Sequence, residues 1–192
     1  RLLEHIGRSA FEDIYHIEDQ EEREEIVNEI VVAIKNLSDS KTGALLVIEQ
    51  STGLGEIVNS GTILDAKITS QLLENIFVPN TPLHDGATII RKDKILASGC
   101  VLPLTSNNTI NKKLGTRHRA ALGLSEVSDS IIIVVSEETG IISLAINGKL
   151  TRNYEGDRLK RVLQNIFKSK DRRRVKTAGE KVRSWIKAKK IK

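Results

Sequence analysis

The chain is poor in the residues that cross-link or stack: among 192 residues, one is cysteine, none is methionine and 3% are aromatic. A single cysteine, Cys100, excludes an internal disulfide and fits a reducing compartment. Since aromatic residues are scarce, the core must be aliphatic. No run approaches the ~20 apolar residues that a membrane span needs, and no signal peptide, internal repeat or low-complexity segment is visible. With 39% apolar residues, this length suggests one globular domain with appendages.

The net charge of +5 is unevenly distributed along the chain. Residues 18–29 are acidic, whereas the tail from Lys168 onward is dense in lysine and arginine. Such a tail can contact nucleic acid or anionic lipid, or it can be a solvated helix that aids solubility. No RNA-binding motif or interleaved aromatic residues accompany it, so we expect no nucleic-acid partner.

The first half of the chain predicts helices around a buried strand. A short helix or linker is predicted over residues 1–14, and Asp19 is suited to cap the helix that follows. The apolar run 43–49 predicts a buried strand. A short strand over 57–63 and a helix capped by Asp65 complete this half. The apolar faces of the two longer helices are Ile26, Ile30, Ile34 and Leu37, and Ile68, Leu72, Leu73 and Ile76.

The second half predicts paired strands and two further helices. Asn147-Gly148 is a strong hairpin signal, and Lys92-Asp93 is a tight turn between two apolar runs. The expected strands are 87–91, 95–102, 131–135, 141–146 and 149–152, and the expected helices are 116–126 and 155–169. The fold class is therefore α/β (α+β), a mixed and mostly antiparallel sheet flanked by helices in one domain.

The stretch 79–87 (Pro-Asn-Thr-Pro-Leu-His-Asp-Gly-Ala) has the features of a site on a loop. Its two prolines end a helix, and an apolar run follows, so His84 and Asp85 lie at the start of a strand. Gly86 permits positive φ and close approach of a ligand. Histidine and aspartate bind metals or move protons. The alternative is an ordinary turn with an exposed histidine.

A second stretch, 115–121 (Gly-Thr-Arg-His-Arg-Ala-Ala), places two arginines at the start of a predicted helix. Basic residues are unfavourable at the positive end of a helix dipole unless an anion is bound there. The guanidinium group also matches phosphate geometry. The alternative is a solvated helix start.

Together with Ser-Glu-Glu-Thr-Gly at 136–140, these two stretches resemble the diadenylate cyclase (DAC) domain. The resemblance covers about residues 20–165, with the three motifs in the order and spacing of the family. The stretches 43–49 and 76–82 are similar to the membrane-anchored bacterial class. The resemblance implies that two ATP molecules are joined into cyclic di-AMP with release of two pyrophosphates.

The resemblance also implies roles for individual residues. Asp85 is expected to orient or deprotonate the attacking hydroxyl, and Gly86 and Ala87 to let the nucleotide sit close. Thr116 and Ser136 are expected to bind ATP. Other implied site residues are Arg117, His118 and Arg119 as catalytic or phosphate-binding groups, Leu102 in the nucleotide pocket, and His84 and Glu138 as metal ligands. His118 can instead be a packing histidine, and Glu137 and Glu138 plain turn residues. Val101 stands where close relatives carry an adenine-stacking tyrosine.

A histidine ligand favours Mn²⁺ or Co²⁺ over Mg²⁺ as the divalent metal. Because one such domain holds one ATP, we expect catalysis in a homodimer. The resemblance implies a membrane regulator protein and a phosphosugar mutase as partners. We expect a DAC domain over residues 19–169, a linker or short helix over 1–18 and a basic tail over 170–192. Because the chain starts at Arg1 and lacks methionine, we expect a fragment or a processed product. The resemblance to the membrane-anchored class implies a parent anchored in the cell membrane, with its catalytic domain on the cytoplasmic side, and we expect this fragment of it to be soluble.

Two other functions compete with a cyclase. One is a catalytically silent module that binds ATP or cyclic di-AMP; intact motifs argue against it. The other is an RNA- or lipid-binding protein acting through the basic tail.

Overall fold

The sheet is organised around β1 (Ala44–Ile48), whose five residues are all buried. In the computed structural model, which describes residues 2–106 and 114–167, β1 pairs in parallel with β3 (Ala87–Arg91) and antiparallel with β5 (Ile131–Val135). The described strands form one sheet in the order β2-β4-β3-β1-β5-β6-β7. Its other pairs are antiparallel, which confirms the predicted fold class. The remaining strands are β2 (Thr62–Lys67), β4 (Lys94–Cys100), β6 (Ile142–Ile146) and β7 (Lys149–Arg152).

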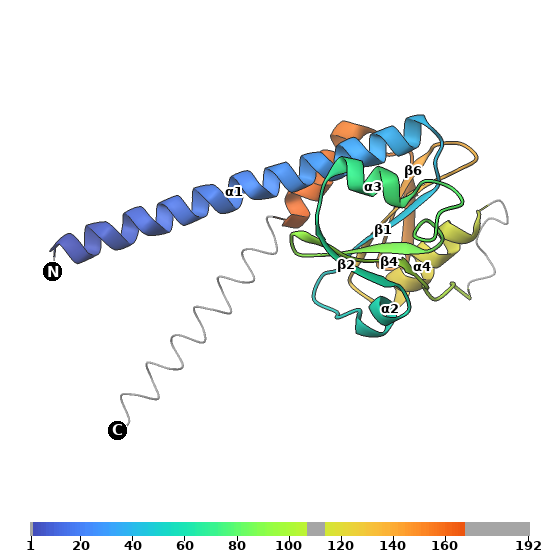
Figure 1. Ribbon diagram of the computed structural model, residues 1–192, viewed down its shortest axis with the longest axis horizontal. Helices are drawn as coiled ribbons and strands as arrows, with labels where there is room; N and C mark the ends of the chain where they lie inside the picture. The colour runs from blue at the N-terminus through green and yellow to red at the C-terminus, as the bar shows by residue number, and fades with distance from the viewer. Residues whose placement is uncertain (1, 107–113, 168–192) are drawn as a thin grey trace, which may run out of the picture.

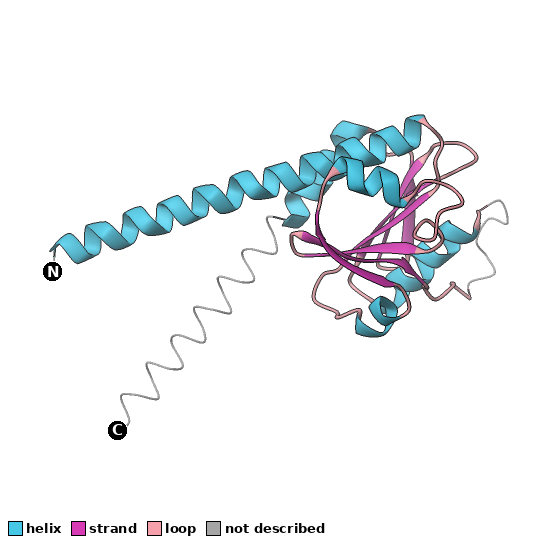
Figure 2. Cartoon of the chain, viewed as in Figure 1, coloured by secondary structure: helices cyan, strands magenta, loops and turns pink. Residues whose placement is uncertain are grey.

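Helices cover both faces of the sheet (Figures 1 and 2). One face packs against α1 (Leu2–Asp39), α3 (Ser70–Ile76) and the helix over 156–167. The other face packs against α2 (Gly55–Asn59) and α4 (Thr116–Val127). Alternate residues of each strand enter the two cores, as the two-residue period of a strand requires. In β1, Ala44, Leu46 and Ile48 belong to the α1 side, and Leu45 and Val47 to the α4 side.

The predicted break near Asp19 is wrong, because Asp19 lies inside the single helix α1. No proline precedes Pro79, and residues 18–25 are rich in glutamate, a good helix former, so nothing interrupts the helix there. The predicted apolar face is confirmed: Ile26, Ile30, Ile34 and Leu37 are buried. In Figure 1 the N-terminal part of α1 projects away from the sheet. No helix in the described ranges 2–106 and 114–167 is long and apolar enough to cross a membrane.

Two predictions between β1 and α3 are also wrong. Residues 55–59 form helix α2, because Leu54 and Val58, four residues apart, both pack into the α4-side core. Asp65 lies within β2 at φ +46, and its carboxylate accepts a hydrogen bond from Lys94 Nζ at 2.9 Å. The residue that caps α3 is Thr69, whose hydroxyl oxygen accepts the Leu72 N–H at 3.2 Å. Pairing of β2 with β4 thus overrides the local capping signal.

The predicted turns and the last described helix are confirmed. Lys92 joins β3 to β4 at φ +59, and Asn147 and Gly148 join β6 to β7 with φ of +49 and +71. In the helix over 156–167, Leu159 and Leu163 are buried. Residues 107–113 of the polar loop, and the basic tail with Trp185, lie outside the described residues.

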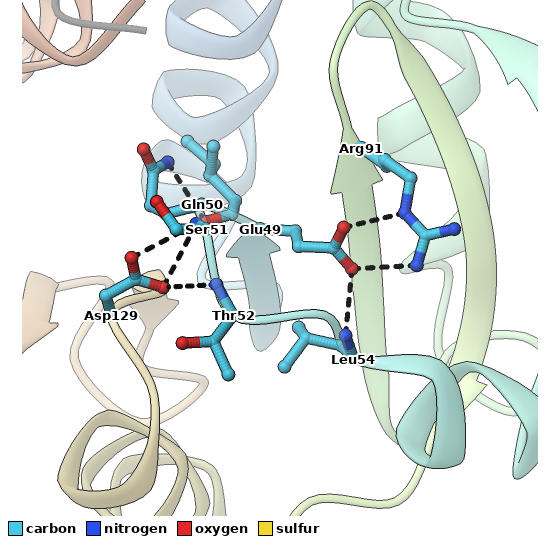
Figure 3. Close-up of polar contacts among 8 residues, drawn as sticks. Glu49, Gln50, Ser51, Thr52, Leu54, Arg91 and Asp129 are labelled. Carbon is cyan, nitrogen blue, oxygen red and sulfur yellow. Dashed lines mark hydrogen bonds and ion pairs between the residues drawn. The ribbon is translucent and has the colours of Figure 1, made fainter. Parts of the chain in front are cut away.

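At the ends of β1 and β3, a partly buried ion pair between Arg91 and Glu49 holds the chain (Figure 3). Arg91 donates from Nε and Nη2 to the two carboxylate oxygens of Glu49, at 2.7 and 2.9 Å. Glu49 also accepts the Leu54 N–H, and Asp129 accepts the N–H groups of Ser51 and Thr52. These contacts fix the chain between β1 and α2 at one edge of the sheet. The motif loops over 79–87 and 136–140 lie at the opposite edge.

Candidate active site

The sheet topology brings two of the three sequence motifs, the loops over 79–87 and 136–140, to one edge. Because β1 and β3 are parallel, the segments that precede them lie at the same edge. Because β5 is antiparallel to β1, with Ala44 opposite Val135, the segment that follows β5 lies there too. The loop ending in Gly86, the turn before β1 and the 136–140 loop therefore meet at one edge, although 50 residues separate Gly86 from Ser136.

A pocket of about 200 Å³ opens between the start of α4 and the 136–140 loop. The predicted residues Thr116, Arg117, His118, Ser136 and Glu138 all line it. Free N–H groups at the first turn of α4 give this pocket a positive end, as an anion site requires. Its other lining residues are Leu114, Gly115, Val135, Glu137, Thr139 and Arg152.

Arg117 is held in this pocket by Glu137. Its Nη1 donates to Glu137 Oε2 at 2.5 Å, and the arginine side chain is 22% exposed. Gly43, just before β1, lies directly beneath this pair: a Cβ there would meet Arg117 Nη1 at 2.7 Å and Glu137 Oε2 at 2.9 Å. Glu137 is therefore more than a turn residue, and Gly43 makes room for the ion pair.

His118 is buried, and its Nε2 lies 3.5 Å from the hydroxyl of Ser143 on β6. Burial lowers the pKa of His118, the positive charge of Arg152 lowers it further, and the carboxylate of Glu138 opposes the shift. The imidazole is thus kept neutral beneath the pocket. This geometry fits the packing role that the sequence left open, and the catalytic role stays a prediction.

The loop before β3 presents Asp85 to solvent. Asp85 is exposed, and within the described residues its carboxylate makes no hydrogen bond or ion pair. Gly86 adopts φ +127, and a Cβ there would meet the Gly99 carbonyl carbon at 2.6 Å, so only glycine fits. Ala87 is buried at the first position of β3, opposite Cys100. The backbone at the start of β3 is therefore tightly constrained, and it carries a carboxylate, that of Asp85, which no described residue binds.

The predicted metal ligands offer two donors at this edge. His84 Nδ1 lies 2.6 Å from the Thr81 carbonyl oxygen, which assigns the proton to Nδ1 and leaves the Nε2 lone pair. That nitrogen has only a 3.4 Å contact with the Asn80 N–H. The carboxylate of Glu138 makes no hydrogen bond or ion pair within the described chain. Over residues 2–106 and 114–167, no three His, Cys, Asp or Glu side chains cluster, so a metal held here needs further ligands from elsewhere.

Leu102 and Arg119 lie outside the pocket lining. Leu102 is buried in the α4-side core, whereas its neighbour Val101 is 70% exposed. The backbone oxygen of Arg119 accepts the Thr105 N–H at 3.1 Å, and its side chain is exposed. The nucleotide contacts expected of Leu102 and Arg119 stay predictions.

The structure adds residues that sequence reasoning missed. Arg152, at the end of β7, lines the pocket. Ser38, near the end of α1, donates a hydrogen bond to the Gly140 carbonyl oxygen at 2.6 Å. Neither residue lies in a motif, and only the folded chain brings them to the 136–140 loop. No sequence signal points to either one.

Comparison with known proteins shows the family of this chain. The family model described as DisA bacterial checkpoint controller nucleotide-binding (DAC) matches residues 31–150. The chain belongs to the DAC family. The matched segment begins within α1 and ends within β7, so it includes all three motifs and the pocket lining except Arg152.

Two members of the DAC family align over most of the chain. The cyclic di-AMP synthase CdaA of Bacillus subtilis is 46% identical over 172 residues, which are 90% of this chain and 63% of that protein. A crystal structure of a double mutant of DacA from Staphylococcus aureus superposes with a TM-score of 0.73 at 42% identity, covering 74% of this chain and 95% of that one.

A third match is a crystal structure from Bacillus cereus described as a hypothetical membrane spanning protein. It has a TM-score of 0.65 at 48% identity and covers 67% of this chain and 63% of that one. The chain thus spans less than two thirds of the Bacillus subtilis relative and of this one.

Proposed function

We propose that this chain is a diadenylate cyclase, which condenses two ATP molecules into cyclic di-AMP and releases two pyrophosphates. The observation that carries the proposal is the meeting, at one sheet edge, of a free carboxylate (Asp85) and an anion pocket built by α4 and the 136–140 loop. The names of its relatives, among them a cyclic di-AMP synthase, support the same activity.

Asp85 acts at the nucleophile. The 3′-hydroxyl of one ATP attacks the α-phosphorus of the other, the new P–O bond forms, and the bond to the β-phosphate oxygen breaks. Asp85 orients the hydroxyl and accepts its proton, a role that a carboxylate without a hydrogen bond or ion pair to the described residues can take. The same step in the second nucleotide closes the ring.

The pocket residues position the phosphates and neutralise their charge. N–H groups at the start of α4, the hydroxyls of Thr116 and Ser136, and the guanidinium of Arg117 supply donors. A divalent cation, Mn²⁺ or Co²⁺ in preference to Mg²⁺ because a histidine is among the ligands, would draw charge from the leaving pyrophosphate. His84 Nε2 and Glu138 would hold it, with phosphate oxygens as further ligands.

Two chains are needed for one product. Each chain supplies one Asp85 loop and one pocket, enough for a single ATP, and each nucleotide must attack the other. The active species is therefore a dimer related by a two-fold axis, with the same surface of both chains at the interface. We further propose that the parent protein is anchored in a membrane, which agrees with the description of the Bacillus cereus relative.

Incubation with ATP and Mn²⁺ followed by mass spectrometry tests the activity. The expected product has the mass of cyclic di-AMP, with two pyrophosphates released for each. Binding of ATP without any product would overturn the proposal and identify a silent nucleotide-binding module instead.

A further inference from the structure

Arg152 is an arginine of the pocket that forms no ion pair with any carboxylate of the described residues. Two arginines line the pocket. The charge of Arg117 is already compensated by Glu137 through a 2.5 Å ion pair. Arg152, at the end of β7, makes no hydrogen bond or ion pair with any other described residue. A polyanion that enters the pocket thus meets two guanidinium groups. That of Arg117 is paired with Glu137, and that of Arg152 is paired with no described carboxylate.

Arg152 is exposed and lines the pocket together with His118. It acts on the buried His118, where it helps to keep the pKa of the imidazole below its usual range. In the sheet, Arg152 is the register partner of Ser143, whose hydroxyl lies 3.5 Å from that same imidazole. Pairing with β6 therefore fixes the backbone of Arg152 beside the pocket.

The strand order shows which part of a nucleotide Arg152 can reach. Asp85 precedes β3, Ser136 follows β5, and Arg152 ends β7, in the sheet order β3-β1-β5-β6-β7. If the ribose lies near Asp85 and the phosphates lie in the pocket, as proposed above, the nucleotide extends along this order past Ser136 toward β7. The terminal phosphates then come nearest to Arg152.

We propose that Arg152 binds the β- and γ-phosphates of ATP, the part that leaves as pyrophosphate. This inference rests on the proposed function for the ribose position, but it concerns nucleotide binding and can be tested without turnover. A planar guanidinium with five donors suits bidentate contact with two phosphate oxygens.

The test compares ATP and AMP binding by calorimetry in wild type, Arg152→Ala and Arg152→Lys. Loss of a charge-assisted contact is expected to weaken ATP binding about ten- to a hundredfold in Arg152→Ala, with partial recovery in Arg152→Lys. AMP lacks the terminal phosphates, so its affinity is expected to stay unchanged. Lys149→Ala, on the same strand, and Arg161→Ala, in the next helix, remove the same charge outside the pocket lining and are expected to bind ATP normally.

An equal loss of ATP and AMP affinity would overturn the inference, and so would unchanged ATP affinity in Arg152→Ala. Thermal melting of each variant separates loss of the fold from loss of the contact, and Arg152→Gln, which keeps most of the side-chain length, replaces an Arg152→Ala protein that fails to fold. If wild type binds ATP without making cyclic di-AMP while Arg152→Ala loses ATP selectively, the inference stands and the proposed function falls. If wild type makes the product and Arg152→Ala binds ATP like wild type, only the inference falls.

Discussion

Ser38 Oγ, at the end of α1, donates a hydrogen bond to the carbonyl oxygen of Gly140 across 2.6 Å. Gly140 has φ +73, and a Cβ there would meet the Ser38 carbonyl oxygen at 2.4 Å. The Gly140 N–H in turn bonds to the Ser136 carbonyl oxygen at 2.8 Å. The end of the long helix therefore supports the loop that carries Ser136.

The first prediction concerns this support. Gly140→Ala is expected to destabilise the fold by about 1–2 kcal/mol through the left-handed backbone alone, and to raise the KM for ATP by displacing the 136–140 loop from α1. Gly148→Ala is a matched control, because its φ is +71 but its Cβ would meet only Glu126 Cγ at 3.4 Å. Thermal melts and ATP kinetics of both variants are the measurement. Equal KM changes in the two variants would contradict this role of α1.

Asp85→Asn is expected to bind ATP like wild type and to lose cyclisation by about 10²- to 10⁴-fold, since the amide cannot accept the hydroxyl proton. The exposed side chain has no hydrogen bond or ion pair within the described residues, so the fold should be unchanged. Asp93→Asn, in the exposed turn at the other end of β3, is the control. Calorimetry and product formation are measured together. Near wild-type turnover in Asp85→Asn would remove this residue from the mechanism.

Arg117→Ala is expected to weaken ATP binding about ten- to a hundredfold. The substitution removes a phosphate donor and leaves the Glu137 carboxylate unpaired at the pocket, where it repels phosphate. Calorimetric titration with ATP measures the effect, with Arg161→Ala as the control. If Arg117→Ala binds ATP normally, the ion pair with Glu137 is purely structural.

The lowered pKa of the buried His118 leads us to expect that the fold loses stability in mild acid. Burial and the Arg152 charge lower the pKa of the folded imidazole below 6.5, so the unfolded chain binds the proton more readily. The stability contribution is present above pH 6.5 and is lost as the pH falls from there toward the folded pKa. Melting temperatures at pH 7.5 and 5.5 are expected to differ more for wild type than for His118→Gln. The same difference in both proteins would contradict a neutral buried histidine.

Much of the fold could be predicted from the sequence because its strongest signals are local. The apolar run 43–49 and the Asn147-Gly148 turn identified β1 and the last hairpin. The errors arose where tertiary pairing decided the outcome. Asp65 looks like a helix cap, but it lies in the outermost strand β2 and pairs with Lys94 of β4.

The site residues also fall into two groups, those that a local motif identifies and those that only the folded chain brings to the site. Thr116, Arg117 and Ser136 were identifiable from motifs, and the pocket brings them together. Arg152 and Ser38 were not identifiable, since their role depends on the register of β7 and on where α1 ends. Sequence spacing carries no information about either contact.

The central claim is that two chains make one product, and the dependence of activity on protein concentration tests it most directly. Specific activity is measured from nanomolar to micromolar protein with light scattering in parallel, and then at fixed wild type with Asp85→Asn added in equal amount. We expect specific activity to rise roughly linearly while monomer dominates. Where dimer dominates, the added variant should lower activity to about half, because mixed dimers form at most one of the two bonds. Constant specific activity with a monomer throughout, and no effect of Asp85→Asn, would contradict the account.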